Sequence, residues 1–152
     1  MSGTLSTRPP EPPSFAEQGG RVPDPSLVTY THAIYALHAL SVLIGVTGPA
    51  TVIGNFVFGF PSIFAVILNY ARQPDVEGTW LQEHFRWQIR TFWYALLWML
   101  VAGAVSLPLV LLFGLGIVTF YLAAMVVGAW VVYRVIRGWL ALRGGRPPRR
   151  RR

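Results

Sequence analysis

The three histidines, His32, His38 and His84, are the side chains of this sequence best suited to acid–base or metal chemistry. His32 and His38 are six residues apart, on different faces of a helix, and no cysteine or nearby acid completes a ligand set. The sequence also has no Ser-His-Asp grouping, no paired membrane carboxylates and no phosphate-binding Gly-rich loop with a lysine. We therefore expect no catalytic residue, no metal site and no cofactor, and a protein that is not an enzyme.

His84 has ionisable neighbours in Glu83 and Arg86. Ionisable groups inside a membrane are functional by default, so a proton relay is one interpretation of this triplet. The triplet belongs, however, to a segment that we expect at the membrane interface, where charge costs little. We therefore expect His84 to anchor this segment.

The segment from Gly78 to Trp93 predicts an interfacial amphipathic helix over 79–90. Thr79 and Gln82 have the spacing of a capping box. A helix this rich in Trp, Phe and Arg is typical of the headgroup layer, with its rings at the boundary and its guanidinium groups on phosphates. We expect the lipid or partner contacts to come from this helix and from two arginines near the C-terminus: Trp80, His84, Arg86, Trp87, Gln88, Arg90, Trp93, Arg134 and Arg137.

Two long stretches without any charged residue flank this segment, from Pro25 to Ala71 and from Thr91 to Tyr133. About 20 apolar residues cross a bilayer as a helix, so each stretch is about twice the length of one crossing. Charged residues make up 12% of the chain, whereas soluble domains have about 25%. The fold class is therefore an all-α membrane protein, a bundle of four membrane elements plus the interfacial helix.

The second stretch predicts a helical hairpin with arms over 91–112 and 117–136. Gly114-Leu115-Gly116 supplies the flexible residues of a tight reversal. Pro108 lies near the outer end of the first arm, where it would kink the helix without ending it.

The first stretch predicts elements over 27–46 and 56–71, separated by a broken or re-entrant segment within 47–60. Gly48-Pro49, Gly54, Gly59 and Pro61 disfavour a straight helix there. Irregular backbone at membrane depth persists where protein buries it or where it lines water. The alternative is one long, kinked crossing with the N-terminus outside.

Both ends of the chain predict disordered tails around a helical membrane domain over 27–143. Residues 1–26 are Pro-rich, and residues 144–152 are Arg-rich. Eight of the 13 arginines follow Tyr133, which places the C-terminus in the cytoplasm at a bacterial inner membrane, together with the 72–90 loop. We expect the tail to contact anionic phospholipids and to bind no nucleic acid.

One group of residues resembles a family of small bacterial multi-pass membrane proteins of unknown function. The residues that carry the resemblance are Asn69-Tyr70, Gly78–Leu81, His84–Trp93, Tyr133-Arg134 and Gly138–Leu140. The family is distantly similar to a membrane subunit of the chloroplast inner-envelope protein translocon. The resemblance covers about residues 29–143 and implies a membrane fold, but no activity.

These observations favour a scaffold or assembly component that acts through its interfacial helix. Ala124 and Gly128 form a small-xxx-small step, which fits either internal packing or a homo-oligomer, and a membrane-protein partner is also expected. The alternative is a small channel or transporter in which the 47–60 segment lines a polar path with Asn55 and Asn69.

Overall fold

The computed structural model describes residues 20–47, 52–112 and 114–148, and this part of the chain is helical without a strand element. Three helical segments are long and apolar enough to cross a membrane, Pro25–Ile44, Leu81–Leu111 and Leu115–Arg143, and Gly59–Ala71 is a shorter apolar one. An all-α membrane bundle is thus confirmed. Its elements are α1 (Pro25–Thr47), α2 (Val52–Ala71), the short η1 (Pro74–Val76), α3 (Leu81–Leu111) and α4 (Leu115–Arg143).

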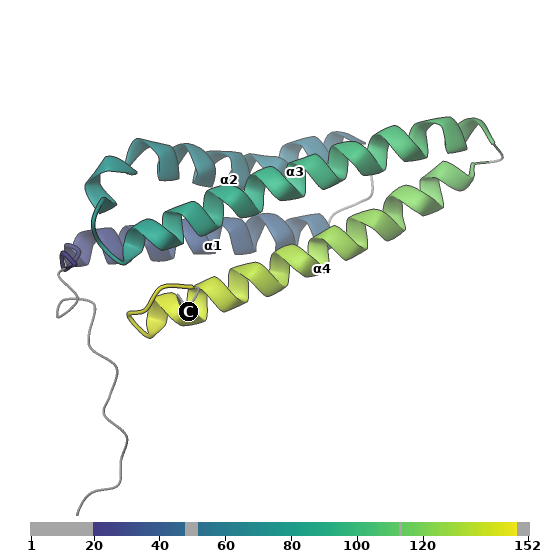
Figure 1. Cartoon of the computed structure of the whole chain (residues 1–152). Helices are drawn as coiled ribbons and strands as arrows, with labels where there is room; N and C mark the ends of the chain where they lie inside the picture. Colours follow the sequence, from purple (N-terminus) through teal and green to yellow (C-terminus); the bar gives the residue numbers. More distant parts are fainter. Residues whose placement is uncertain (1–19, 48–51, 113, 149–152) are drawn as a thin grey trace, which may run out of the picture.

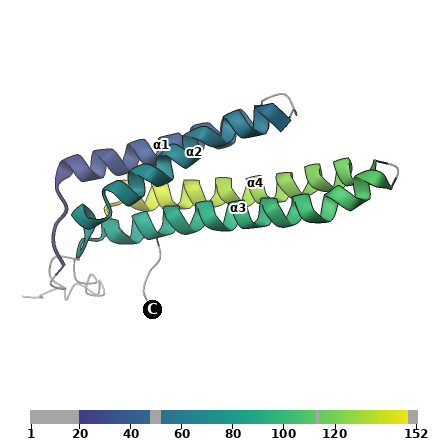
Figure 2. The same cartoon turned by 90° about the horizontal axis from the view of Figure 1, so that it is seen from above.

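The helices form two hairpins, α1 with α2 and α3 with α4 (Figure 1). The hairpins lie close together at the end where α1 begins and α4 ends, and they separate toward the other end (Figure 2). The α3–α4 hairpin also extends beyond the α1–α2 hairpin. At about 1.5 Å per residue, α3 is about 46 Å long, which exceeds the ~30 Å hydrocarbon layer of a bilayer. We call the end that carries the 72–80 loop and the C-terminal turn the loop end.

The buried apolar core lies at the loop end. Its side chains come from all four long helices and from η1, whereas large apolar side chains further along α3 and α4 are exposed. This distribution is typical of a membrane protein, because lipid tails solvate an apolar helix face as well as another helix does. The core consists of Ile34, Tyr35, Ala65, Val76, Leu81, Phe85, Val135 and Leu142.

The predicted α3–α4 hairpin is confirmed, with ends that differ from those expected. Gly114 has a positive φ of 73°, as a tight reversal requires, and Pro108 lies inside α3 without ending it. The predicted interfacial helix over 79–90 is continuous with the crossing as the first part of α3. The predicted capping box is wrong, since the Thr79 hydroxyl donates to the Val76 carbonyl and Trp80 is the N-cap.

The prediction of irregular backbone within 47–60 is wrong for residues 52–60, which are helical. The α2 helix continues through Gly59 and Pro61 because every backbone polar group in a membrane needs a partner, and a helix supplies most of them internally. Residues 48–51 lie outside the described part of the chain. The antiparallel pairing of α1 with α2, joined by a hydrogen bond from Tyr30 Oη to the Leu68 carbonyl, contradicts the alternative of one kinked crossing.

The start of α1 corrects the prediction of a disordered segment up to residue 26. The Arg21 amide donates to the Gly78 carbonyl, which ties the entry of α1 to the loop before α3. Asp24 then caps α1, with its carboxylate accepting a hydrogen bond from the Ser26 amide at 2.7 Å. Hydrogen bonds from the Ser26 side chain and from the Ser26 amide hold the pKa of Asp24 below its usual range. Residues 1–19 lie outside the described part.

The end of α4 corrects the prediction of disorder from residue 144. Gly145 has a φ of 60°, its amide donates to the Leu142 carbonyl, and the Arg146 amide donates to the Ala141 carbonyl. This is the hydrogen-bond pattern of a Schellman motif. The motif turns residues 146–148 back over the loop end, and residues 149–152 lie outside the described part.

Candidate functional site

The centre of the loop end is His84, whose side chain is fully buried in the first turn of α3. Its Nε2 lies 2.9 Å from the Arg146 carbonyl and its Nδ1 lies 3.0 Å from Tyr35 Oη. A carbonyl only accepts hydrogen bonds, so Nε2 carries the proton. In the neutral ring, Nδ1 then accepts from the Tyr35 hydroxyl. One imidazole thus joins α1, α3 and the C-terminal turn.

Aromatic rings pack around this imidazole. Trp80 meets the His84 ring edge-on at 5.5 Å between centroids, and Trp139 stacks on Tyr35 at 6.5 Å with an interplanar angle of 11°. Trp139 Nε1 also donates to His32 Nδ1 at 2.9 Å. We call His32, Tyr35, Trp80, His84 and Trp139 the interhelical cluster, because it binds α1, α3 and α4 together.

Gly138 lets α4 approach the cluster. A Cβ built at this position overlaps the ring and hydroxyl of Tyr35, so any larger residue would push α4 away from α1. Small residues at helix contacts have this role in membranes, where packing replaces the hydrophobic effect as the source of helix association.

Arg134 forms a second junction, between α4 and α3. Its Nε donates to Thr91 Oγ1 at 2.7 Å, and its guanidinium lies 3.7 Å from the Trp87 ring centroid and 5.0 Å from that of Trp130. Trp87 Nε1 in turn donates to the Arg134 carbonyl at 3.1 Å. The charge of Arg134 is thus used inside the hairpin, at the depth where the charge-free stretch of α3 begins.

The residues predicted to contact lipid or a partner divide into two groups. His84 and Gln88 are buried, and Trp80, Trp87 and Arg134 are half-buried within the bundle. The expectation that His84 and Gln88 contact lipid is therefore wrong, because their strip of α3 faces the other helices. The other predicted residues are exposed: Arg86, Arg90, Trp93 and Arg137. Arg86 pairs with Glu83 at 3.4 Å, and the Arg90 guanidinium lies over the Tyr94 ring. Trp93 Nε1 donates a hydrogen bond to Tyr70 Oη, and Arg137 Nη1 donates one to Tyr133 Oη.

Several buried polar groups lack a hydrogen-bond partner within the described part of the chain. They are both amide atoms of Asn69, both amide atoms of Gln88, Nε2 of His38 and Oγ of Ser106. The sequence indicates Asn69 only as part of the polar path of the channel alternative, and Gln88 only as an interfacial contact. Tyr35 and Trp139 of the interhelical cluster, and Gly138 beside it, were not predicted from the sequence. Gly138 and Trp139 nevertheless belong to the residues that carry the family resemblance.

The chemistry of the interhelical cluster is that of a structural contact. The hydrogen bonds run from the Tyr35 hydroxyl through His84 to the Arg146 carbonyl. A carbonyl oxygen accepts a hydrogen bond but has no proton to pass on. Glu83, the nearest acid in sequence, pairs with Arg86 on the exposed side of α3. Within the described residues, no group of three or more His, Cys, Asp or Glu side chains could hold a metal ion.

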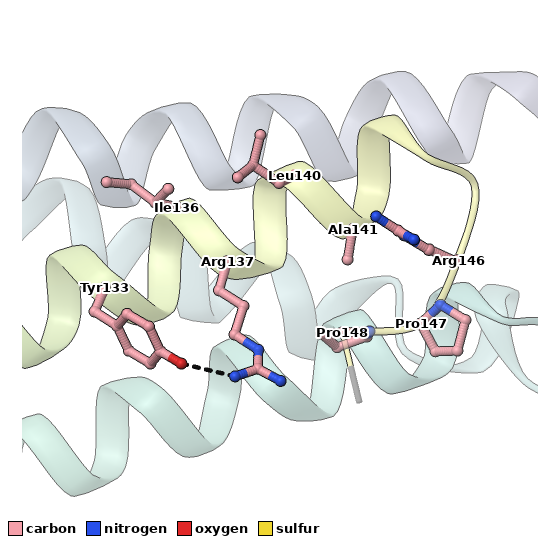
Figure 3. Close-up of a pocket in the computed structure, with 8 residues that line it drawn as sticks. All are labelled: Tyr133, Ile136, Arg137, Leu140, Ala141, Arg146, Pro147 and Pro148. Carbon is pink, nitrogen blue, oxygen red and sulfur yellow. Dashed lines mark hydrogen bonds between the residues drawn. The ribbon is translucent and has the colours of Figure 1, made fainter. Parts of the chain in front are cut away.

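Concave surfaces in the described part of the chain include the hairpin groove and the C-terminal pocket. The hairpin groove has a volume of about 660 Å³ and lies between α3 and α4 in the apolar stretch. Its lining is Trp98, Val101, Ala102, Val105, Ser106, Thr119, Leu122, Ala123, Val126, Val127 and Trp130. The C-terminal pocket has a volume of about 570 Å³ and is lined by Tyr133, Ile136, Arg137, Leu140, Ala141, Arg146, Pro147 and Pro148 (Figure 3).

No family model, no curated protein and no solved structure matches the chain.

Proposed function

We propose that this protein is a non-enzymatic, multi-pass scaffold or assembly component of a bacterial inner membrane. The observation that carries the proposal is the hairpin groove, an open apolar surface on a hairpin whose loop end is firmly packed. A helix of a membrane-protein partner fits such a groove, and a second copy of the chain is the alternative occupant. Small residues in its lining, Ala102 and Ala123 among them, allow a partner backbone to come close.

The distribution of arginine supports cytoplasmic placement of the loop end. The 72–90 segment contains Arg72, Arg86 and Arg90, and the last turns of α4 contain Arg137 and Arg143. The opposite end, around Gly114, carries no charge. Basic residues near the ends of spans stay on the cytoplasmic side, so we place both described chain ends there.

The resemblance to the bacterial family implies a membrane fold, and it covers the packed end of the hairpin. The residues of the resemblance include Trp87 and Arg134, which hold the hairpin together at the cytoplasmic end of the groove.

Cysteine-directed photo-crosslinking tests the groove as the partner site, since the chain has no native cysteine. Val101→Cys places a benzophenone label in the groove. Leu100→Cys places the same label on the adjacent residue, which is 63% exposed and does not line the groove. We expect Val101→Cys to give discrete protein adducts in cell membranes and Leu100→Cys to label lipid. Equal adduct patterns for the two variants would contradict a partner site in the groove.

A small channel is the second candidate, and the buried amides of Asn69 and Gln88 favour it. Unpartnered amides inside a membrane bundle are costly unless water or a transported solute contacts them. A flux assay on purified protein in liposomes separates the two functions. The scaffold predicts no flux, whereas a channel predicts flux that Asn69→Leu reduces.

A further inference from the structure

We propose that the C-terminal pocket binds one anionic phospholipid, with Arg137 and Arg146 supplying the positive charge for its phosphate and with its glycerol backbone and first acyl carbons against Ile136 and Leu140. The proposal concerns a different surface from the hairpin groove. It requires only that the chain lies in a membrane, so it stands or falls independently of the scaffold function.

The first argument is the charge of the pocket. Two guanidinium groups line it, one from α4 and one from the turn that follows, and its lining residues include no acid (Figure 3). Arg72 pairs with Asp75 and Arg86 pairs with Glu83, and none of these four residues lines the pocket. Guanidinium groups match the geometry of phosphate oxygens, and two of them suit a phosphodiester.

The second argument is that the Arg137 guanidinium and the backbone of Arg146 are both held before a ligand binds. Arg137 Nη1 donates to Tyr133 Oη at 2.7 Å on the same face of α4. The Schellman motif returns the chain at Gly145, and the Arg146 carbonyl is held by buried His84. A held Arg137 side chain and a fixed backbone at Arg146 reduce the conformational entropy that is lost on binding, compared with two arginines on a mobile segment.

The third argument is the depth and the wall of the pocket. Tyr133 ends the charge-free stretch, and Arg137 follows one turn later, about 6 Å further along the axis, which is the thickness of a headgroup layer. Ile136 and Leu140 are 52% and 57% exposed on this side of α4. The glycerol backbone and first acyl carbons of a bound lipid would cover them, whereas a soluble phosphate compound would leave them in water. This apolar wall favours a lipid over a free phosphate.

The test uses the full-length protein in detergent, with native mass spectrometry of bound phosphatidylglycerol against phosphatidylcholine. The variant Arg137→Gln/Arg146→Gln removes both cations but keeps the Arg146 carbonyl that His84 requires. The control Arg21→Gln/Arg72→Gln removes the same charge from the same end outside the pocket. An arginine–anionic lipid contact near the surface corresponds to about fivefold in affinity, so the pocket variant should lose about 25-fold.

We expect the control to keep its phosphatidylglycerol affinity within about twofold, since its two arginines do not line the pocket. Equal losses in both variants would show a general charge effect and overturn the site. Equal affinity of the unaltered protein for the two lipids would do the same. Competition by soluble glycerophosphoglycerol at the concentration of the lipid would overturn the lipid as the occupant. Ile136→Ser/Leu140→Ser should weaken lipid binding while leaving binding of the soluble phosphodiester unchanged.

Discussion

Replacing Arg134 with glutamine should separate α3 from α4 at the loop end. The substitution removes the charged hydrogen bond to Thr91 Oγ1 and the guanidinium contact with the Trp87 ring. A hydrogen bond to a charged group is worth about 1.5–3 kcal/mol. A partly exposed cation–π contact adds about 1 kcal/mol. The expected loss in free energy of unfolding is therefore about 3 kcal/mol.

Arg137→Gln is the matched control for this experiment. It lies one turn later on α4 and removes the same charge, but its hydrogen bond to Tyr133 stays within α4 and is exposed. Unfolding in mixed micelles by SDS titration should show a loss near zero for the control. Similar losses for the two variants would refute the assignment of Arg134 to the helix junction.

A double-mutant cycle with Thr91→Ala then isolates the contact. If Arg134 acts through the Thr91 hydroxyl, the loss caused by Arg134→Gln should shrink by at least about 1 kcal/mol in the Thr91→Ala background. Additive losses would place the effect of Arg134 elsewhere, for instance on lipid phosphates as its sequence position had indicated.

Three further predictions test other parts of the structure. Gly138→Val should destabilise the contact of α1 with α4 because its Cβ overlaps the Tyr35 ring, whereas Gly128→Val, with open space around the built Cβ, should leave micellar unfolding unchanged. Reporter fusions after Gln73 and after Arg143 should both score cytoplasmic, and a periplasmic score for either would contradict the proposed orientation. The Asp24 cap should be present above the ordinary pKa of aspartate and lost as the pH falls through its lowered pKa, so the protection of the Ser26 amide relative to its intrinsic exchange rate should fall only in acid, and Asp24→Ala should remove this pH dependence.

The sequence predicts the membrane helices where a long charge-free stretch and a glycine turn mark them. The charge-free stretch and the glycines at 114 and 116 were enough to predict the α3–α4 hairpin, which the structure confirms. The ends of the helices were not predictable in this way. Hydropathy reports where lipid surrounds the chain, whereas α3 begins at Leu81 and α4 ends at Arg143, both within the headgroup layer or beyond it.

The course of α2 was mispredicted because propensities measured in water were applied to a membrane segment. Gly59 and Pro61 interrupt helices in water, where an opened backbone group can bond to solvent. In lipid the alternative to a helix is an unpaired group, so the helix persists with one missing bond at Pro61. Predictions of irregular membrane segments therefore need more than glycine and proline.

For the interhelical cluster, the sequence indicates which residues of α3 lie together but not whether they face lipid or the other helices. Trp80, His84 and Trp87 have helical spacing, and all three are buried or half-buried at the loop end. The direction that these residues face was not predictable, because aromatic side chains suit both a lipid interface and a bundle interior. The deciding partners of His84 are Tyr35, 49 positions away, and Arg146, 62 positions away, and such separations leave no periodic signal.

The hairpin groove owes its shape to close contacts at both of its ends. At the loop end, Arg134 joins Thr91 one turn after Trp130, the lining residue of the groove nearest this end on α4. At the turn end, a Cβ built at Gly116 would overlap the Ser106 carbonyl and the Val110 amide, so the backbones of α3 and α4 touch there. The groove lies between these two points and cannot close by moving the helices together. A surface held open in this way loses little entropy when a partner helix enters, which is the physical reason to assign the groove a binding role.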